Sequence, residues 1–173
     1  LAFGLSPITY LGFSMPWLWG LLVSILMLGI QSATEELVFR GYFMQLLGEI
    51  FQRPWLIIAL SGICFGWLHA SNAEVETYGF GLMMSQYIYM GLFLGLLVVL
   101  DNRLELAIGF HAINNILAST LLSFKGSSLK THSLFYAETT NQTLGFIALV
   151  VFSLLFLFLA HKKYNFQFSE RLK

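Results

Sequence analysis

Long runs of uncharged, apolar residues are the feature that most constrains the fold of this chain. Asp, Glu, Lys and Arg are absent from residues 17–30, 55–68, 81–100 and 143–160. Only 10% of all residues are charged, whereas soluble domains carry about 25%. A backbone that crosses lipid must satisfy its own hydrogen bonds, and a helix does so within one segment. We therefore predict an all-α, polytopic transmembrane helix bundle.

The polar breaks between these runs predict where each span begins and ends. A chain of 173 residues is long enough for five or six spans of about 20 residues each. We expect helices over 16–47, 55–70, 81–100, 104–124 and 143–160. The first is either one long helix or two helices that meet near 29–32. Residues 1–13 are apolar but short, and we interpret them as the stub of a truncated helix.

The chain is expected to form one membrane-embedded domain over residues 1–173. It begins at Leu1 without a methionine, so we expect it to lack earlier spans. In this layout one side of the membrane carries six basic residues, which are Arg53, Arg103, Lys162, Lys163, Arg171 and Lys173. The other side carries two, Lys125 and Lys130. Because cytoplasmic loops are enriched in Lys and Arg, we expect the C-terminus in the cytoplasm.

Charge and cysteine content exclude several classes of function. The net charge is zero and no basic stripe is present, so nucleic acid is not an expected partner. Cys64 is the single cysteine, which excludes an internal disulfide and the usual multi-cysteine zinc site.

Three charged residues nevertheless lie inside the first predicted span. Glu36 and Arg40 are i and i+4, so one turn of helix can pair them. Glu35 has no such charged partner, and we expect it to be unpaired within its own helix. An ionisable residue at membrane depth is costly and marks a candidate functional site.

Two further predicted spans each carry a strong polar group. Phe65 and His69 are i and i+4 near the end of one span, so the phenyl ring can lie against the imidazole. His111 and Asn115 have the same spacing in another span and share a helix face. Such residues can simply join helices, but hydrogen bonds between membrane helices average only about 0.6 kcal/mol. Three polar faces together favour a functional site.

These residues form three ordered motifs, Glu35-Glu36-x-x-x-Arg40, Phe65-x-x-x-His69 and His111-x-x-x-Asn115. On separate apolar helices and in this order they resemble the CPBP family. That family includes the CAAX prenyl-protein endopeptidases, the bacterial Abi proteins, and bacteriocin-processing and immunity proteins. The stretch Glu-Glu-Leu-Val-Phe-Arg-Gly at 35–41 is especially similar, and the resemblance covers a motif core of about 21–117.

The resemblance implies an intramembrane endopeptidase in a multi-pass protein of a bacterial cytoplasmic membrane. Its substrate would be a membrane-bound or lipidated peptide or protein, either a CAAX-type prenyl protein or a bacteriocin-like peptide. Amide hydrolysis needs an activated water and donors for the oxyanion. Glu35 is the candidate base, with His69 positioning the same water. The resemblance assigns His111 and Asn115 to the oxyanion. Supporting roles are expected for three residues, Glu36, Arg40 and Phe65.

The involvement of a metal stays open at the level of sequence. Members of the family are often named metalloproteases, and Glu35, His69 and His111 could supply the ligands of a catalytic Zn²⁺. The chain has no His-Glu-x-x-His motif. Asn115 is a poor zinc ligand but a good oxyanion donor, so a metal-free glutamate mechanism accounts for one more residue.

Two other functions fit the same composition. An immunity or peptide-sequestering membrane protein could use this fold without obligatory catalysis. A small transporter could relay protons through buried Glu and His, but it predicts repeated halves or paired helix breaks, and neither is visible.

The shared site also makes a geometric demand. At 1.5 Å per residue, His69 would lie roughly 22 Å along its helix from Pro54, and His111 roughly 12 Å from Arg103. If both helices begin on the same side of the membrane, one of them must tilt or begin deeper.

Overall fold

A computed structural model describes residues 7–129 and 131–166 of the chain. Its helices are α1 (Met15–Glu36), α2 (Met44–Ile50), α3 (Pro54–Trp67), α4 (Ala73–Tyr78), α5 (Phe80–Asp101), α6 (Glu105–Thr120) and α7 (Gln142–Tyr164), with a π-helical segment η1 (Leu37–Phe43). The predicted all-α membrane helix bundle is confirmed.

The first predicted span is one continuous helix rather than two. Helical backbone runs over Met15–Ile50, with Ser14 capping the N-terminus and Pro16 in the first turn. The irregularity lies at η1, not at 29–32, and η1 begins directly after the glutamate pair. π-Helical turns inside α-helices frequently occur at functional sites.

Three helices are long and apolar enough to cross a membrane, and these are Met15–Ile50, Phe80–Asp101 and Gln142–Tyr164. α3 is apolar but shorter, because the chain turns after Trp67. α6 ends at Thr120, earlier than the predicted boundary, because the following residues enter a strand. Among the described residues the bundle therefore combines full-length spans with shorter apolar helices.

A small sheet covers one end of the bundle and was not predicted. β1 (Ile8–Tyr10) pairs antiparallel with β3 (Phe135–Ala137), and β2 (Leu122–Phe124) pairs parallel with β3. The expectation of a helical stub over 1–13 is thus wrong for residues 8–10, and residues 1–6 lie outside the described part of the chain. β-Branched and aromatic residues suit strands, but this strand forms only through partners far along the sequence.

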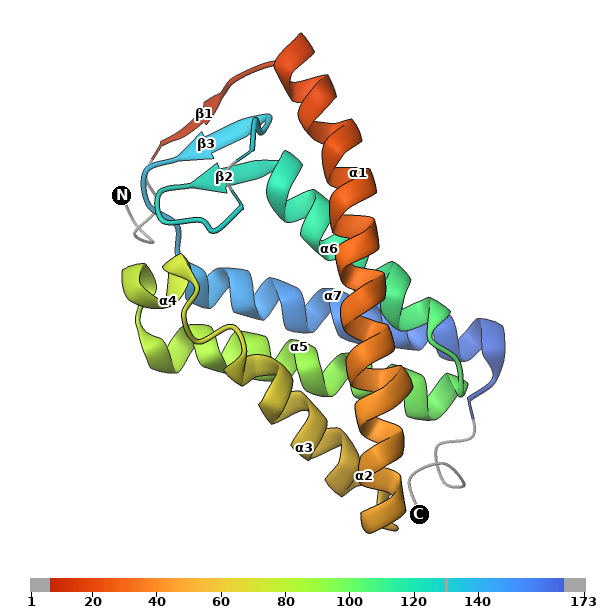
Figure 1. The fold of residues 1–173 in the computed structure, drawn as a ribbon. Coiled ribbons are helices and arrows are strands. Elements are labelled where there is room, and N and C mark those ends of the chain that lie inside the picture. The colour runs from red at the N-terminus through yellow and green to blue at the C-terminus, as the bar shows by residue number, and fades with distance from the viewer. Residues whose placement is uncertain (1–6, 130, 167–173) are drawn as a thin grey trace.

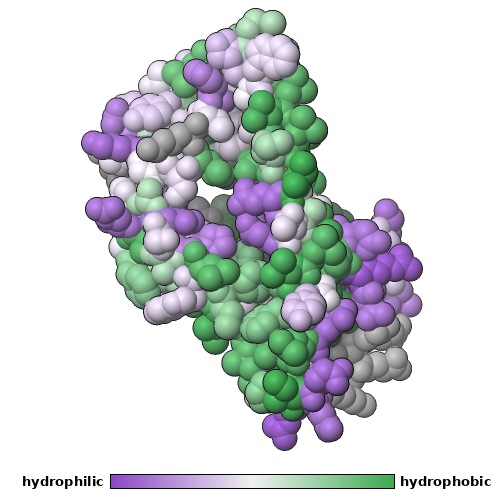
Figure 2. All heavy atoms as spheres, in the orientation of Figure 1, coloured by the Kyte–Doolittle hydropathy of each residue, from purple (hydrophilic) through white to green (hydrophobic). Residues whose placement is uncertain are grey.

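The helices cross one another rather than standing parallel (Figure 1). α5 and α7 run side by side in one direction: Gln86 Nε2 donates to Gln142 O near their starts, and Leu100 packs with Ala160 near their ends. α1 packs against α6, α3 packs against α5, and η1 contacts α5 through the hydrogen bond from Arg40 to the carbonyl oxygen of Gly91. The outward sides of α1 and α7 expose apolar side chains, as expected for surfaces in lipid. Figure 2 shows such side chains along α1.

Glycines allow the backbones of α3 and α5 to pack directly against each other. A Cβ atom on Gly91 would lie 2.7 Å from the carbonyl oxygen of Gly62, and one on Gly66 would lie 2.9 Å from the amide nitrogen of Ile88. The Gly62–Gly66 spacing thus forms a helix interface of the small-xxx-small type.

We expect Gly91→Ala to destabilise the bundle by about 1–3 kcal/mol, because the added methyl group meets backbone rather than a flexible side chain. Thermal unfolding in detergent measures the change. Gly29→Ala is the matched control, since a Cβ atom there meets nothing within 4 Å. Equal melting temperatures for the two variants would contradict this interface.

Candidate active site

The polar faces of the motif helices meet around one cavity of about 570 Å³. Four side chains that the sequence singles out for chemistry line it, namely Glu35, His69, His111 and Asn115. They come from α1, from the turn after α3, and from α6. Figure 2 shows this face of the molecule hollowed at its centre, with hydrophilic side chains around the hollow.

The ring of Phe65 contacts both His69 and His111. Its ring centroid lies 4.8 Å from that of His69 and 5.7 Å from that of His111. The ring is buried in the main core cluster and also contacts Phe39 of η1. Because the helices cross, the two histidines reach one site despite their different distances from the helix starts.

A buried ion pair lies behind the cavity wall. Arg40 Nη1 donates to Glu36 Oε1 at 2.9 Å, and Arg40 Nη2 donates to the carbonyl oxygen of Gly91 at 2.9 Å. The pairing predicted from the i, i+4 spacing is present, and both side chains are fully buried. The guanidinium also lies 4.5 Å from the centroid of the Phe65 ring. These contacts tie α1 and η1 to α3 and α5.

Glu36 has a second partner that the sequence did not reveal. His111 Nδ1 lies 2.8 Å from Glu36 Oε1 across the α1–α6 interface. With Glu36 ionised, Nδ1 donates this hydrogen bond, which leaves Nε2 directed at Glu35. Glu36 therefore orients the imidazole of His111 as well as pairing with Arg40.

Glu35 faces the cavity, and one of its two carboxylate oxygens accepts a hydrogen bond while the other has no partner among the described residues. Gln31 Nε2 donates to Glu35 Oε1 at 2.9 Å, so the expectation of no partner within its own helix is wrong. Gln31 lies one turn earlier and is uncharged, so the pattern of charged residues does not indicate this contact. Glu35 Oε2 is buried without a hydrogen-bond partner among the described residues, 3.8 Å from His111 Nε2.

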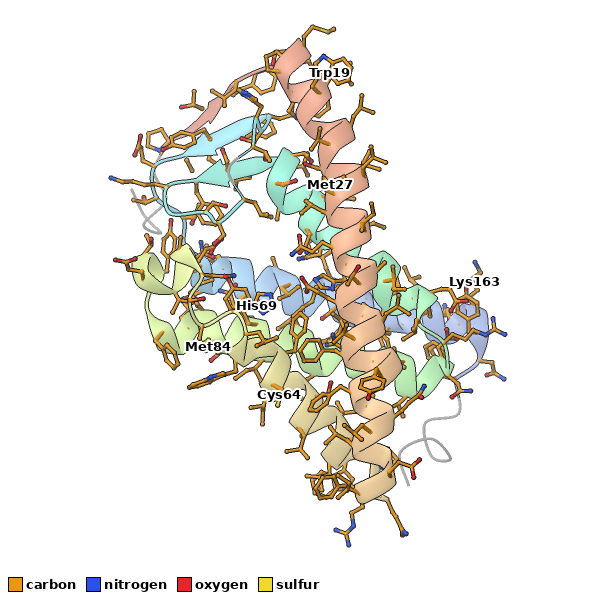
Figure 3. The ribbon with its side chains drawn as sticks, viewed as in Figure 1. Trp19, Met27, Cys64, His69, Met84 and Lys163 are labelled. Atoms are coloured by element: carbon orange, nitrogen blue, oxygen red, sulfur yellow. The ribbon has the colours of Figure 1, made fainter. Side chains whose placement is uncertain are left out.

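His69 lies just beyond the end of α3 and not within it. Its Nδ1 is 2.9 Å from the carbonyl oxygen of Phe65, so Nδ1 donates there and Nε2 is left for the cavity. The imidazole also stacks on the ring of Tyr87 from α5, with centroids 4.8 Å apart and planes 26° apart. Figure 3 shows His69 toward the interior, while Cys64 lies on the outer side of α3.

Asn115 lies one helical turn after His111 and lines the same cavity. Its Oδ1 accepts a hydrogen bond of 3.4 Å from Asn114 Nδ2. The Nδ2 group of Asn115 is therefore the part of the amide that can donate to a bound group.

The proposed zinc ligands do not form a metal site in this arrangement. Across the described residues no three His, Cys, Asp or Glu side chains lie close enough together to hold a metal ion. Of the three candidate ligands, Glu35 and His111 approach one another, with 3.8 Å between Oε2 and Nε2, whereas the His69 ring contacts Phe65 and Tyr87. We therefore derive no chemical step through a metal.

An apolar groove adjoins the cavity between α6 and α7. It measures about 530 Å³ and is lined by side chains such as Phe110, Ala148, Phe152 and Leu155. Asn114 and Leu149 line both the groove and the cavity, so the two spaces share a wall. The site thus combines a polar chamber with an apolar extension.

Comparison with known proteins is consistent with this geometry. The family model described as type II CAAX prenyl endopeptidase Rce1-like matches residues 15–117, which include all three motifs. The uncharacterized protein YyaK of Bacillus subtilis (strain 168) is 28% identical over 111 residues, a stretch that covers 64% of this chain and 37% of YyaK. No solved structure matches the chain. The chain belongs to the type II CAAX prenyl endopeptidase Rce1-like family.

Proposed function

We propose that this chain hydrolyses a peptide bond of a membrane-associated substrate inside the cavity of about 570 Å³. Its family is one of membrane-embedded CAAX-type peptidases in general. The observation that carries the proposal is Glu35 Oε2, a buried oxygen without a hydrogen-bond partner among the described residues. It lies 3.8 Å from His111 Nε2, in a cavity that His69 and Asn115 also line.

Glu35 is the proposed general base. Its Oε2 takes a proton from a water molecule as the water oxygen forms a bond to the scissile carbonyl carbon. Gln31 holds the other oxygen of the carboxylate, which fixes its direction. When the C–N bond breaks, Glu35 returns the proton to the departing amine. The products are a free carboxyl and a free amine.

His69 is proposed to orient the same water. With Nδ1 bound to the Phe65 carbonyl oxygen, Nε2 can accept a hydrogen bond from the water. Its contribution is positional, because a correctly held nucleophile avoids much of the entropic part of the barrier.

His111 and Asn115 are the proposed donors to the oxyanion. They share one face of α6, and both line the cavity. For Nε2 of His111 to donate while Nδ1 donates to Glu36, the imidazole carries both protons during this step. Donors that are fixed in advance stabilise the tetrahedral intermediate most effectively.

A substrate with an attached lipid chain fits the site better than a plain peptide. The α6–α7 groove is apolar and shares a wall with the cavity, so a lipid chain can lie in the groove while the peptide reaches Glu35. Among the substrates considered, the groove favours a lipidated peptide of the CAAX type over an unmodified bacteriocin-like peptide.

The test compares a farnesylated CAAX peptide with the same peptide without the lipid, in detergent micelles containing purified protein. We expect cleavage of the farnesylated peptide, and a kcat/KM lower by about tenfold or more when the buried lipid is missing. Ala148→Phe should remove this preference because it fills the groove. Ile147→Phe, on an exposed position next to it, is the control. Binding of either peptide without any cleavage would support sequestration instead.

We also propose that the C-terminus lies in the cytoplasm of a bacterium. Arg103 follows α5, and Lys162 lies in the last turn of α7; the ends of these two helices pack together. The cavity lies toward the opposite ends of α5 and α7, where Gln86 and Gln142 line it. Basic residues favour the cytoplasmic side of a membrane, so the end that holds Arg103 and Lys162 faces the cytoplasm. The cavity end then faces the outside of the cell.

Cysteine labelling of intact cells measures that orientation. In a Cys64→Ser background, a membrane-impermeant maleimide should label Lys125→Cys but not Lys162→Cys. The reverse pattern would place the cavity end of the bundle in the cytoplasm and overturn the proposed orientation, while leaving the proposed chemistry in place.

A further inference from the structure

A polar cluster on the cavity wall has no part in the chemistry proposed above. It consists of Asn72, Glu74, Tyr87 and Ser128, all of which line the cavity. Glu74 is only 8% exposed, although it belongs to the short helix α4 in a polar link. A buried carboxylate is costly unless hydrogen bonds satisfy it, and the donors around Glu74 do so, which makes the four residues one ordered cluster.

His69 lies against this cluster, in the turn that follows α3. Backbone hydrogen bonds fix its main chain, because His69 N–H donates to Gly66 O and Asn72 N–H donates to His69 O, both at 3.0 Å, but they leave the direction of the imidazole to its side-chain contacts. The carbonyl oxygen of Phe65 holds one edge of the imidazole. The face of the imidazole lies against the ring of Tyr87. The planes of these two rings are 26° apart, whereas the planes of His69 and Phe65 are 40° apart, so the contact with Tyr87 is the more nearly parallel one.

Tyr87 is in turn held through its hydroxyl group. Asn72 Nδ2 donates to the hydroxyl oxygen at 3.1 Å, and the hydroxyl lies 3.5 Å from Glu74 Oε2 as its acceptor. Ser128 fixes the same carboxylate, because its backbone N–H donates to Glu74 Oε1 at 2.7 Å and its hydroxyl donates to Oε2. The ring of Tyr87 is therefore anchored at its polar end by Asn72, which directly precedes α4, and by Glu74 of α4, whose carboxylate Ser128 holds in turn.

We propose that Tyr87 is a positioning residue for His69. Its ring holds the imidazole in the orientation that presents Nε2 to the water at Glu35, and Asn72, Glu74 and Ser128 hold the ring. Tyr87 acts through His69 and not on the substrate. This inference rests on the proposed peptidase function, and it adds an aromatic support from α5 to the three motifs.

Kinetics separate positioning from ordinary packing. Removal of the ring in Tyr87→Leu or Tyr87→Met should lower kcat by about 10- to 100-fold with KM nearly unchanged, because misplacement by about 1 Å can cost that much. Tyr87→Phe keeps the ring but loses the hydroxyl that Asn72 and Glu74 hold, so it should lower kcat by a smaller factor, about three- to tenfold. Tyr89→Leu is the control. Tyr89 belongs to the same helix and stacks with Phe93, but it does not line the cavity. This variant should lower the melting temperature without lowering kcat.

Nuclear magnetic resonance of ¹³C-histidine-labelled protein tests the same contact without any substrate. The His69 signal is assigned by its loss in His69→Asn. The stacked Tyr87 ring should shift it, and the shift should persist in Tyr87→Phe and disappear in Tyr87→Met. A nuclear Overhauser contact between the two rings in the parent protein provides the same information if the variants do not fold.

Three results would overturn the inference. One is a parent protein whose His69 signal shows no contact with Tyr87. Another is full kcat in Tyr87→Leu or Tyr87→Met. The third is a parent protein that shows the contact but cleaves no peptide, which would reject the proposed function and reduce Tyr87 to a packing residue.

Discussion

Glu35→Gln is expected to lower kcat by about 10²- to 10⁴-fold, the range that a positioned general base contributes. Glutamine has nearly the same shape and can keep a hydrogen bond to Gln31, but it cannot take a proton from water. The variant should therefore fold and bind substrate like the parent protein. Cleavage of the farnesylated peptide in micelles, with KM measured separately, provides the comparison.

Glu49→Gln is the matched control for this change. Glu49 belongs to the same continuous helix, is exposed and does not line the cavity. It should keep the activity of the parent protein. If Glu35→Gln also keeps that activity, Glu35 is not the base and the proposed mechanism is wrong.

The largest loss of stability is expected from breaking the buried ion pair. Glu36→Leu leaves the guanidinium of Arg40 without its carboxylate, and removing one partner of a buried pair costs about 3–5 kcal/mol. The variant also removes the acceptor for His111 Nδ1, so activity should fall together with stability. Unfolding in detergent by heat or by a denaturing surfactant measures the first effect.

The double variant Glu36→Leu/Arg40→Met should recover much of that stability, because well-packed apolar residues can replace a buried pair at little cost. Activity should not recover, since His111 still lacks its acceptor. Arg53→Gln, which removes an exposed charge, should change the melting temperature little. A single Glu36→Leu variant as stable as the parent protein would show that the pair contributes nothing.

The contacts that sequence alone could predict are those between residues one helical turn apart. Glu36 with Arg40 and Phe65 with His69 follow from the i, i+4 spacing, and both contacts are present. The bond from Gln31 to Glu35 has the same spacing and could have been found in the same way. Its donor is an uncharged amide, which a pattern of opposite charges does not indicate.

Contacts between elements were beyond such reasoning. The bond from His111 to Glu36 and the stacking of Tyr87 on His69 depend on how α6 and α5 cross their neighbours. β1 forms only because β3 lies beside it, so its short apolar sequence could equally be read as a helical stub. Spacing along one segment cannot determine such pairings.

We propose that Glu35 and His69 act on one water in one cavity, and a double-mutant cycle tests this most directly. The rates of Glu35→Gln, His69→Ala and the double variant are measured on the farnesylated peptide with excess protein. Residues that act as a unit are strongly non-additive, so the double variant should be within about threefold of Glu35→Gln alone. A double variant whose loss equals the product of the two single losses would contradict the account.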